Sequence, residues 1–377
     1  MSVRKAIKER ILVLDASRSV TVASNLLSTE RADKYKTSIK EEYVGVREQR
    51  KNRSHIKECI TIQEARNQPL LLNWDDYSAP IPNQLGITVL NEIKIEEITP
   101  YIDWTPFFSS WQMKGKYPAI LEDDVVGVEA QKLYDDANRM LKKIIIDKTI
   151  TAKAIFGIFS ANSKGDDVVI DNNIGMQEVM YFLRQQRKKA PGKTYASLSD
   201  FIAPASHNDY LGMFAVTAGI GIEKVVAQYE ADHDDYNAIM CKAVCDRLAE
   251  ALAEKLHYDV RTDYWGYENK SVIDYVEMIK ERYQGIRPAP GYPACPDHTE
   301  KGILWDLLDA ENSIGMELTT SYAMFPPSSV SGLHFFNEAA RYFNVGKIER
   351  DQLAIYVERK GMTMEEGEKW MAPNLPD

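Results

Sequence analysis

The sequence has 377 residues, of which 44% are hydrophobic and 27% are charged, and 46 basic against 56 acidic residues give a formal net charge of −10. These proportions fit a globular protein with one large or two smaller domains. No apolar run approaches the roughly 18 residues of a membrane-spanning helix, and the first residues lack the apolar segment and cleavage site of a signal peptide. The lack of both segments predicts a cytoplasmic protein without a membrane partner. Since nucleic-acid binding requires a basic surface, the net negative charge also predicts no nucleic-acid partner.

The four cysteines are Cys59, Cys241, Cys245 and Cys295. In a long chain without a secretion signal they are expected to be free thiols. Cys241 and Cys245 stand one helical turn apart, but no further cysteine follows at the spacing of an iron–sulfur site. Burial as small apolar side chains is therefore the better interpretation. His-Glu-x-x-His and similar ligand spacings are missing as well, so we predict no metal site.

The first 97 residues carry weaker patterns than the rest of the chain. Residues 11–14 (ILVL) predict one short strand, which cannot form a stable sheet by itself. Residues 20–68 are polar and mostly helical in pattern, which predicts an exposed arm or linker. Three prolines between residues 69 and 86 favour an extended, loop-rich stretch.

The main body begins near Ile98. Apolar residues recur at helical spacing over residues 123–144. Short apolar runs predict strands at residues 154–159, 168–170 and 209–217.

A long segment without helix breakers follows these strands. Residues 222–260 contain no proline or glycine, and predict one long helix or two helices broken near His233. Hairpin-like strand pairs beside long helices, without regular strand–helix alternation, favour an α+β fold over a doubly wound one. We therefore expect a mostly antiparallel twisted sheet flanked by long helices, in a single large domain that could be C-shaped and that carries an N-terminal helical arm.

The most unusual segment is residues 287–301, which contain four prolines within nine residues. The prolines fix φ and remove backbone donors, and Gly291 permits a tight turn or the close approach of a ligand. Arg287 offers a planar fork suited to a carboxylate. Asp297 and Glu300 have the spacing of a capping box that would open an amphipathic helix. From these residues alone, a rigid connection with Arg287 paired to a surface acid is as good an interpretation as a ligand-binding loop.

Residues 286–301 (IRPAPGYPACPDHTEK) resemble the signature of the reactivation domain of cobalamin-dependent methionine synthase. Further blocks agree with this family at residues 101–111, 115–127, 228–240, 246–254, 264–267 and 328–332. The segment LDASRS near the N-terminus resembles the end of the family's cobalamin-binding domain. The resemblance therefore implies three segments: residues 1–19 as the remnant of a cobalamin-binding domain, residues 20–97 as a linker and helical arm, and residues 98–377 as a reactivation domain that binds S-adenosylmethionine.

In this family the domain binds S-adenosylmethionine and supports the reductive methylation of cob(II)alamin to methylcobalamin, with an electron from flavodoxin or a flavodoxin-reductase-like donor. The resemblance implies the same for this chain, with the cobalamin-binding domain of the same enzyme as its partner. The cobalamin motif Asp-x-His-x-x-Gly and the zinc-binding cysteines of the parent enzyme are absent. The chain alone is thus not expected to make methionine. It would be a fragment of a longer enzyme or a separately encoded module, and the orphan strand at residues 11–14 favours the fragment.

The resemblance also implies which residues meet the cofactor: Asp103, Glu250, Arg287, Ala289, Gly291, Tyr292, Tyr342 and Phe343. Arg287 would hold the carboxylate of S-adenosylmethionine. Asp103 would accept hydrogen bonds from its cationic amine, although the residue type alone favours an N-cap. Glu250 shares an acidic helical face with Asp246, and Phe343 stands where the family commonly has a second tyrosine, so that a hydroxyl contact is lost there.

No catalytic acid or base is expected, because the methyl acceptor, cob(I)alamin, is itself a strong nucleophile. The protein's task would be to position the reactants and to exclude competing chemistry. Glu281 and Lys116 lie in matching blocks and would face the partner domain or the reductase.

Two other interpretations are open. Residues 217–221 (TAGIG) follow a predicted strand and open a helix, as in a Rossmann-type methyltransferase or dehydrogenase, but Lys224 stands where the third glycine belongs. The chain could also be a non-catalytic sensor that binds S-adenosylmethionine and recruits a partner.

Overall fold

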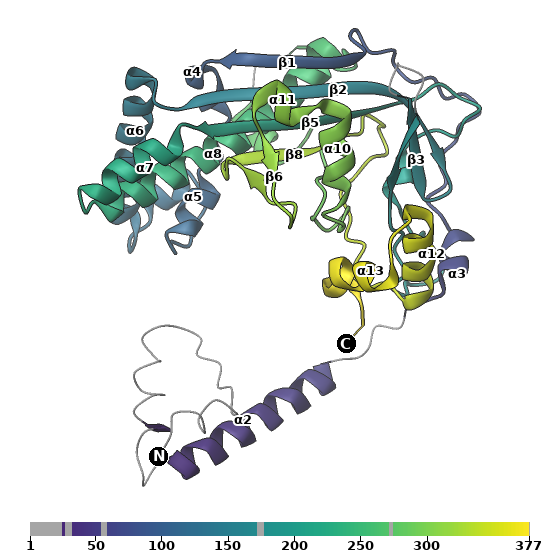
Figure 1. Ribbon diagram of the computed structural model, residues 1–377, viewed down its shortest axis with the longest axis horizontal. Coiled ribbons are helices and arrows are strands. Elements are labelled where there is room, and N and C mark those ends of the chain that lie inside the picture. Colours follow the sequence, from purple (N-terminus) through teal and green to yellow (C-terminus); the bar gives the residue numbers. More distant parts are fainter. Residues whose placement is uncertain (1–24, 27–31, 54–58, 172–176, 271–273, 377) are drawn as a thin grey trace. The chain divides into compact units, whose positions relative to one another are not determined.

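The computed structural model describes residues 25–26, 32–53, 59–171, 177–270 and 274–376. The chain divides into two compact units, Met1–Glu58 and Cys59–Asp377. The first unit contains the polar helix α2 (Ala32–Arg53), which lies in the segment predicted to be a helical arm (Figure 1). The strand predicted at residues 11–14 lies outside the described residues.

The second unit starts at Cys59, upstream of the expected domain start at residue 98. Its first elements are α3 (Ile62–Arg66), β1 (Gly86–Ile93) and α4 (Ile95–Ile98). The proline-containing stretch between α3 and β1 forms neither helix nor strand, as predicted. Because β1 pairs with the central strand of the sheet, part of the segment expected to be a linker is built into this unit.

A six-stranded sheet forms the centre of the second unit, as far as the described residues go. Its order is β4-β3-β2-β5-β8, and β1 pairs with β2. The strands are β2 (Thr151–Lys164), β3 (Asp167–Asp171), β4 (Gln177–Tyr181), β5 (Tyr210–Ile220) and β8 (Ser329–His334). Every pairing among them is antiparallel, which confirms the predicted sheet and argues against a Rossmann-type fold. A separate hairpin joins β6 (Glu317–Leu318) to β7 (Met324–Phe325).

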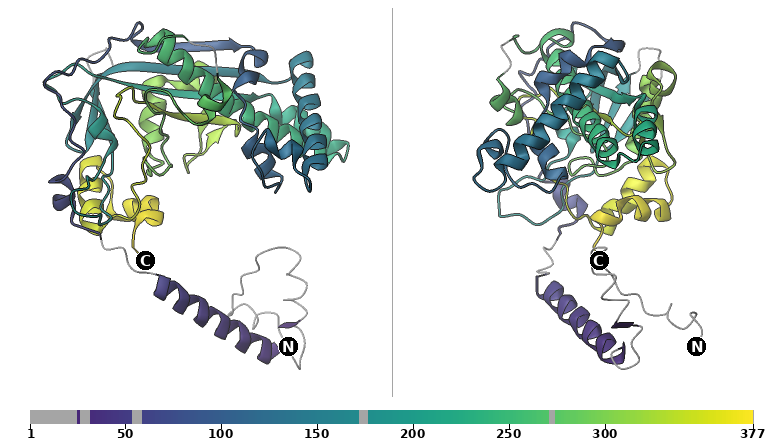
Figure 2. Two further views of the ribbon diagram at one scale, coloured as in Figure 1. Left: turned by 180° about the vertical axis from the view of Figure 1, so that it is seen from behind. Right: turned by 90° about the vertical axis from the view of Figure 1, so that its left-hand side faces the viewer.

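Helices cover both faces of the sheet and extend beyond its ends (Figures 1 and 2). Their bounds are α5 (Thr105–Ser110), α6 (Gly127–Asp147), α7 (Ile222–Ala231), α8 (Asp235–Asp259), α9 (Tyr275–Ile279), α10 (Glu300–Leu308), α11 (Ala310–Ile314), α12 (Arg350–Lys360) and α13 (Met364–Met371). Short 3-10 turns lie at Thr99–Tyr101, Ala119–Glu122, Leu198–Phe201 and Ala372–Asn374, and a π-helical turn at Val260–Tyr264 follows α8. In Figure 1, α5–α7 and α12–α13 project to the same side of the sheet, which gives this unit the predicted C-like outline.

The long helical segment is broken where the second of the two predicted alternatives places the break. α7 ends at Ala231, and His233 adopts the left-handed conformation with φ of 56°. Asp234 then accepts a hydrogen bond from the backbone N–H of Asn237 and caps α8. A left-handed residue followed by a new cap ends one helix and starts the next.

The sheet separates two hydrophobic layers. Along β2, Phe156 and Ile158 belong to the layer that contains α6 and α8, whereas Ile155 and Phe159 belong to the layer with α10 and α11. This alternation follows from the two-residue period of a strand. Because β2 and β5 are buried on both faces, they appear in the sequence as nearly continuous apolar runs.

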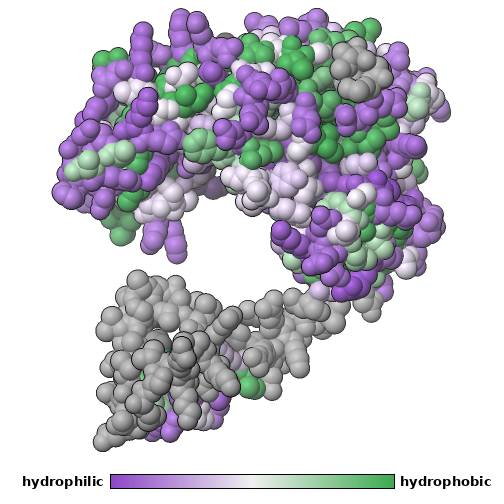
Figure 3. All heavy atoms as spheres, viewed as in Figure 1, coloured by the Kyte–Doolittle hydropathy of each residue, from purple (hydrophilic) through white to green (hydrophobic). Residues whose placement is uncertain are grey.

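The surface of the second unit carries hydrophilic side chains over most of the face seen in Figure 3. No helix among the described residues combines the length and the hydrophobicity needed to span a bilayer. Cys241 and Cys245 lie on α8 and are fully buried in the hydrophobic layer that contains this helix. This confirms the prediction that they are small apolar core residues. All four cysteines lie in the described residues, and none of them forms a disulfide.

Candidate functional site

The proline-rich loop lies along the free edge of β8. The backbone N–H of Ile286 donates to the carbonyl of Phe335, that of Phe335 donates back, and that of Leu333 donates to the carbonyl of Pro288 at 2.8 Å. Further along, the N–H of Gly291 donates to the carbonyl of Cys295 at 2.7 Å and closes a tight turn. The prolines need no such bonds, so the first part of the loop is tied to the sheet edge and the next part is closed on itself.

Gly291 occupies a position that other residues would strain. Its φ is 93°, and a Cβ atom built there would lie 2.2 Å from the His298 ring. The conformation and the close ring contact together explain the glycine.

Gly291→Ala is expected to reduce the free energy of unfolding by about 2–4 kcal/mol, because it adds a left-handed strain and a steric clash. Urea unfolding measures the change. Gly192→Ala is the matched control, since Gly192 has φ of 79° but open space around it. Its cost should be the strain alone, about 1–2 kcal/mol. Equal costs for the two variants would contradict the assigned clash.

Arg287 pairs with a buried acid rather than a surface one. Its Nη2 lies 2.6 Å from Oε2 of Glu254 on α8, and its side chain is 17% exposed. Its backbone N–H donates to the hydroxyl of Tyr342 at 3.0 Å. Burial by itself lowers the pKa of Arg287, but the charge of Glu254 raises it above its ordinary value. The structure thus brings together two of the predicted residues, Arg287 and Tyr342, around an ion pair.

The other residues predicted to line the site beside the loop differ in accessibility. Tyr292 is 61% exposed and Tyr342 is 42% exposed, so both rings are open to a ligand. Ala289 is partly buried. Phe343 instead packs between two core clusters, with its ring centroid 6.3 Å from that of Phe201.

Asp103 and Glu250 lie on other elements. Asp103 sits between a 3-10 turn and α5, and its Oδ1 accepts a hydrogen bond from the N–H of Thr105 at 2.9 Å. It therefore stabilises a turn, as its residue type suggests, while it also lies near the hydroxyl of Tyr275. Glu250 is partly buried on α8, one helical turn before Glu254.

Sequence reasoning missed Glu254. Glu254 lies four residues after Glu250 on α8, where Ala251, Leu252, Ala253 and Leu256 around it are buried. An acid at a core-facing helical position is rarely left unpaired. That position was the signal from which a buried partner for a cation could have been inferred.

A layer of aromatic and histidine rings lies behind the ion pair. The rings of Phe214, His334 and His257 stack with interplanar angles of 10° and centroid distances of 4.7 and 5.0 Å. Burial, together with the Arg287 and Arg261 charges, lowers the pKa of His334 to about 3. Burial, followed by the charges of His334 and both arginines, also lowers the pKa of His257 well below its usual range. Both rings are therefore neutral.

The predicted capping box is wrong. Thr299 is the residue before α10 and makes no side-chain cap. Asp297 accepts a 2.8 Å bond from the N–H of Thr299 and a 2.7 Å bond from Lys360 on α12, and Glu300 also pairs with Lys360. The hydroxyl of Tyr356 donates to Asp297 at 2.6 Å. These carboxylates serve a buried ion cluster that ties the end of the loop to α12, so they are not free to cap the helix.

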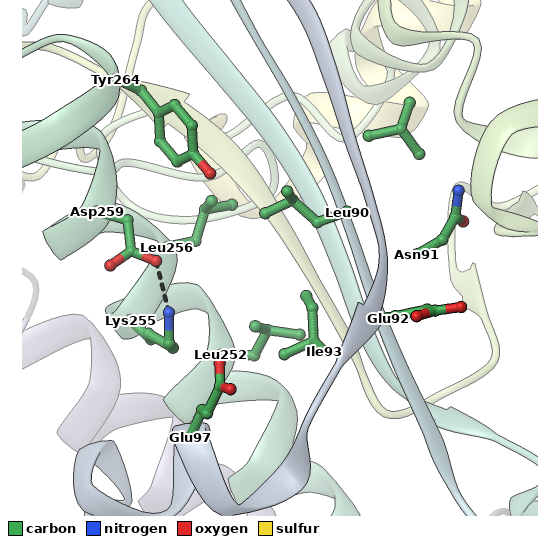
Figure 4. A pocket seen from close by; sticks show the side chains of 11 residues that line it. Leu90, Asn91, Glu92, Ile93, Glu97, Leu252, Lys255, Leu256, Asp259 and Tyr264 are labelled. Atoms are coloured by element: carbon green, nitrogen blue, oxygen red, sulfur yellow. Dashed lines mark hydrogen bonds and ion pairs between the residues drawn. The ribbon is translucent and has the colours of Figure 1, made fainter.

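Among the described residues, two of the pockets lie beside the C-terminal half of α8. One, of about 470 Å³, lies between β1 and α8, and the Lys255–Asp259 ion pair lines its α8 wall (Figure 4). None of the predicted cofactor residues lines it. The other, of about 240 Å³, is lined by ten residues that include Tyr101, Glu254 and Tyr283, and it adjoins the partner of Arg287. No cluster of metal-ligating side chains occurs within the described ranges.

Comparison with known proteins agrees with this arrangement. Residues 94–361 match the family model described as the activation domain of vitamin B12 dependent methionine synthase. A solved structure described as the MetH reactivation domain bound to AdoHcy matches with a TM-score of 0.81 and 48% sequence identity, over 85% of this chain and 99% of that chain. On both grounds, the chain belongs to the family of activation domains of vitamin B12-dependent methionine synthase.

Proposed function

We propose that the chain binds S-adenosylmethionine beside the proline-rich loop and donates its methyl group to cobalamin held by another domain of the same enzyme. The observation that carries this proposal is the likeness to a domain that binds AdoHcy, the product that remains when S-adenosylmethionine gives up its methyl group. A site that accepts one of these molecules must fit most of the other.

The residues have complementary chemistry for such a ligand. The partly exposed guanidinium of Arg287 suits the carboxylate of the amino-acid end. Asp103 keeps Oδ2 in addition to the oxygen that accepts from Thr105, and it suits the ammonium. Ala289, Gly291, Tyr292 and Tyr342 would line the same site, together with Glu250 and the backbone of Phe343.

The chain's own contribution to the reaction is positioning. Reduced cobalamin supplies a nucleophilic cobalt, and the sulfonium makes the methyl carbon electrophilic, so no side chain has to move a proton. The rigid loop would hold the methyl group in line with its acceptor and limit access of water. Flavodoxin or a flavodoxin-reductase-like protein would provide the electron that returns oxidised cobalamin to the reactive state.

Calorimetric titration with S-adenosylmethionine, compared with ATP and NADH, tests the proposal. We expect binding of S-adenosylmethionine and none of comparable strength for the other two. The chain is then mixed with a cobalamin-bearing domain under reducing conditions, and transfer of the methyl group is measured. Binding without transfer would favour the sensor, and no binding would refute both.

Asp103→Asn is expected to weaken S-adenosylmethionine binding by about 1.5–3 kcal/mol, because the carboxylate that faces the ammonium is lost. Thermal stability should change little, since the amide oxygen can still accept the hydrogen bond from Thr105. Calorimetry and thermal unfolding of the same sample separate the two effects. An unchanged affinity would show that Asp103 only stabilises its turn.

A further inference from the structure

Glu254 is a buried acid to which the proposed function gives no task. The residue is 6% exposed. Its Oε2 accepts from Arg287 at 2.6 Å and from the hydroxyl of Tyr283 at 3.4 Å, while Oε1 is buried without a partner. Within the described part of the chain, Arg287 is the one cation that it pairs with. A carboxylate in this setting is costly unless its counter-ion stays in place.

Arg287 in turn relies on Glu254 as its ion-pair partner. Glu254 is the one acid that pairs with Arg287 among the described residues. The Nε atom of Arg287 is buried without a partner. The nearby imidazole rings of His257 and His334 carry no negative charge whether or not they are protonated, so they offer no second counter-ion. The hydroxyl of Tyr342 holds the backbone N–H of Arg287, while among the described residues Glu254 is the one carboxylate at ion-pair distance from the guanidinium.

We propose that Glu254 is a positioning residue, which holds the Arg287 guanidinium in the orientation that receives the carboxylate of the cofactor's amino-acid end. The proposal rests on the proposed function. Glu254 acts through Arg287, because its own side chain is only 9% exposed and Oε1 is enclosed. A guanidinium that is already oriented loses less side-chain freedom when the ligand binds, and so binds more tightly.

Glu254→Gln in the full chain tests the proposal, because the amide keeps the shape of the side chain and removes its charge. Two ligands are titrated by calorimetry: S-adenosylmethionine, and its decarboxylated analogue, which lacks the group that Arg287 would hold. We expect the variant to bind S-adenosylmethionine about tenfold more weakly and the analogue within about twofold of the unaltered chain. A general loss of folded protein would weaken both ligands by the same factor.

A second variant completes a thermodynamic cycle. In an Arg287→Met background, Glu254→Gln is expected to have no further effect on S-adenosylmethionine affinity, because the residue through which Glu254 acts is gone. Asp259→Asn is the matched control, since it removes an acid from another 2.6 Å ion pair of the same helix, with Lys255. Its affinity for both ligands should match that of the unaltered chain.

Three outcomes would overturn the proposal. Equal losses for the two ligands would mean that Glu254 only supports the fold. Tighter binding of S-adenosylmethionine by Glu254→Gln would mean that Glu254 competes with the ligand for Arg287. Unchanged binding by Glu254→Gln, with a loss in Arg287→Met, would remove the role of Glu254 and leave the proposed function standing. If the unaltered chain binds neither ligand, the proposed function itself fails.

Discussion

Replacement of Arg287 by methionine is expected to weaken S-adenosylmethionine binding by about 2–4 kcal/mol, because a charge-assisted hydrogen-bond pair is lost and the ligand carboxylate is left without a partner. Methionine retains much of the apolar stem, so the loss reports on the guanidinium. Calorimetric titration gives the difference directly. Arg282→Met is a suitable control, since Arg282 lies in the same stretch of chain but is exposed and pairs with Glu277. An unchanged affinity in Arg287→Met would refute the assigned binding mode.

The same substitution should also destabilise the fold. It leaves the enclosed carboxylate of Glu254 without its counter-ion, a change that costs about 3–5 kcal/mol when a buried pair is broken from one side. Adding Glu254→Gln to Arg287→Met removes that charge and should recover part of the lost stability, as measured by urea unfolding. A double variant less stable than the single one would contradict the ion pair as described.

Lys360→Met is expected to reduce the free energy of unfolding by about 3–5 kcal/mol. Lys360 is 9% exposed and pairs with two acids, Asp297 and Glu300, whose side chains are 3% and 0% exposed. Without the ammonium, two buried carboxylates face each other unpaired. Urea unfolding measures the loss, and Arg350→Met serves as control because its pair with Glu368 is exposed. Exposed pairs contribute about 0–1 kcal/mol, so similar losses in both variants would contradict the cluster's importance.

The cost of Lys360→Met should depend on pH. Burial raises the pKa of Glu300 from 4.5 to about 7, although Lys360 acts in the opposite direction. The folded state therefore holds this proton more tightly than the unfolded state does. The contribution of Glu300 to stability falls as the pH rises from 4.5, the ordinary pKa of the residue, through about 7. Loss of Lys360 raises that pKa further. Lys360→Met should thus lower the free energy of unfolding more above pH 7 than near pH 4.5, the ordinary pKa of Glu300. A loss that does not change with pH would contradict this account.

Elements with a strong local pattern were predicted, and elements without one were not. The buried strands β2 and β5 appear as apolar runs, and the break near His233 was one of the predicted alternatives. No strand was predicted at β8, whose sequence SVSGLH is short and partly polar. It becomes a strand because β5 pairs with it along one edge and the proline-rich loop contacts the other. Such pairing partners are distant in sequence and leave no local signal.

The candidate site shows the same division. The loop at residues 286–301 could be identified from its own residues, because prolines and Gly291 restrict the backbone wherever the segment is placed. The environment of its charged residues could not. Asp297 and Glu300 have the spacing of a capping box, but Lys360, 63 residues after Asp297, draws them into an ion cluster.

By itself, the sequence determined the family, the antiparallel character of the sheet and the stiffness of the proline-rich loop, since each depends on residue types and their spacing. Only the tertiary structure decided that Arg287 meets Glu254, 33 residues away, and that both lie beside two neutral histidines. The reason is physical. The partner of a buried charge is selected by the packing of distant elements that removes water from both groups, and spacing along the chain does not encode that packing.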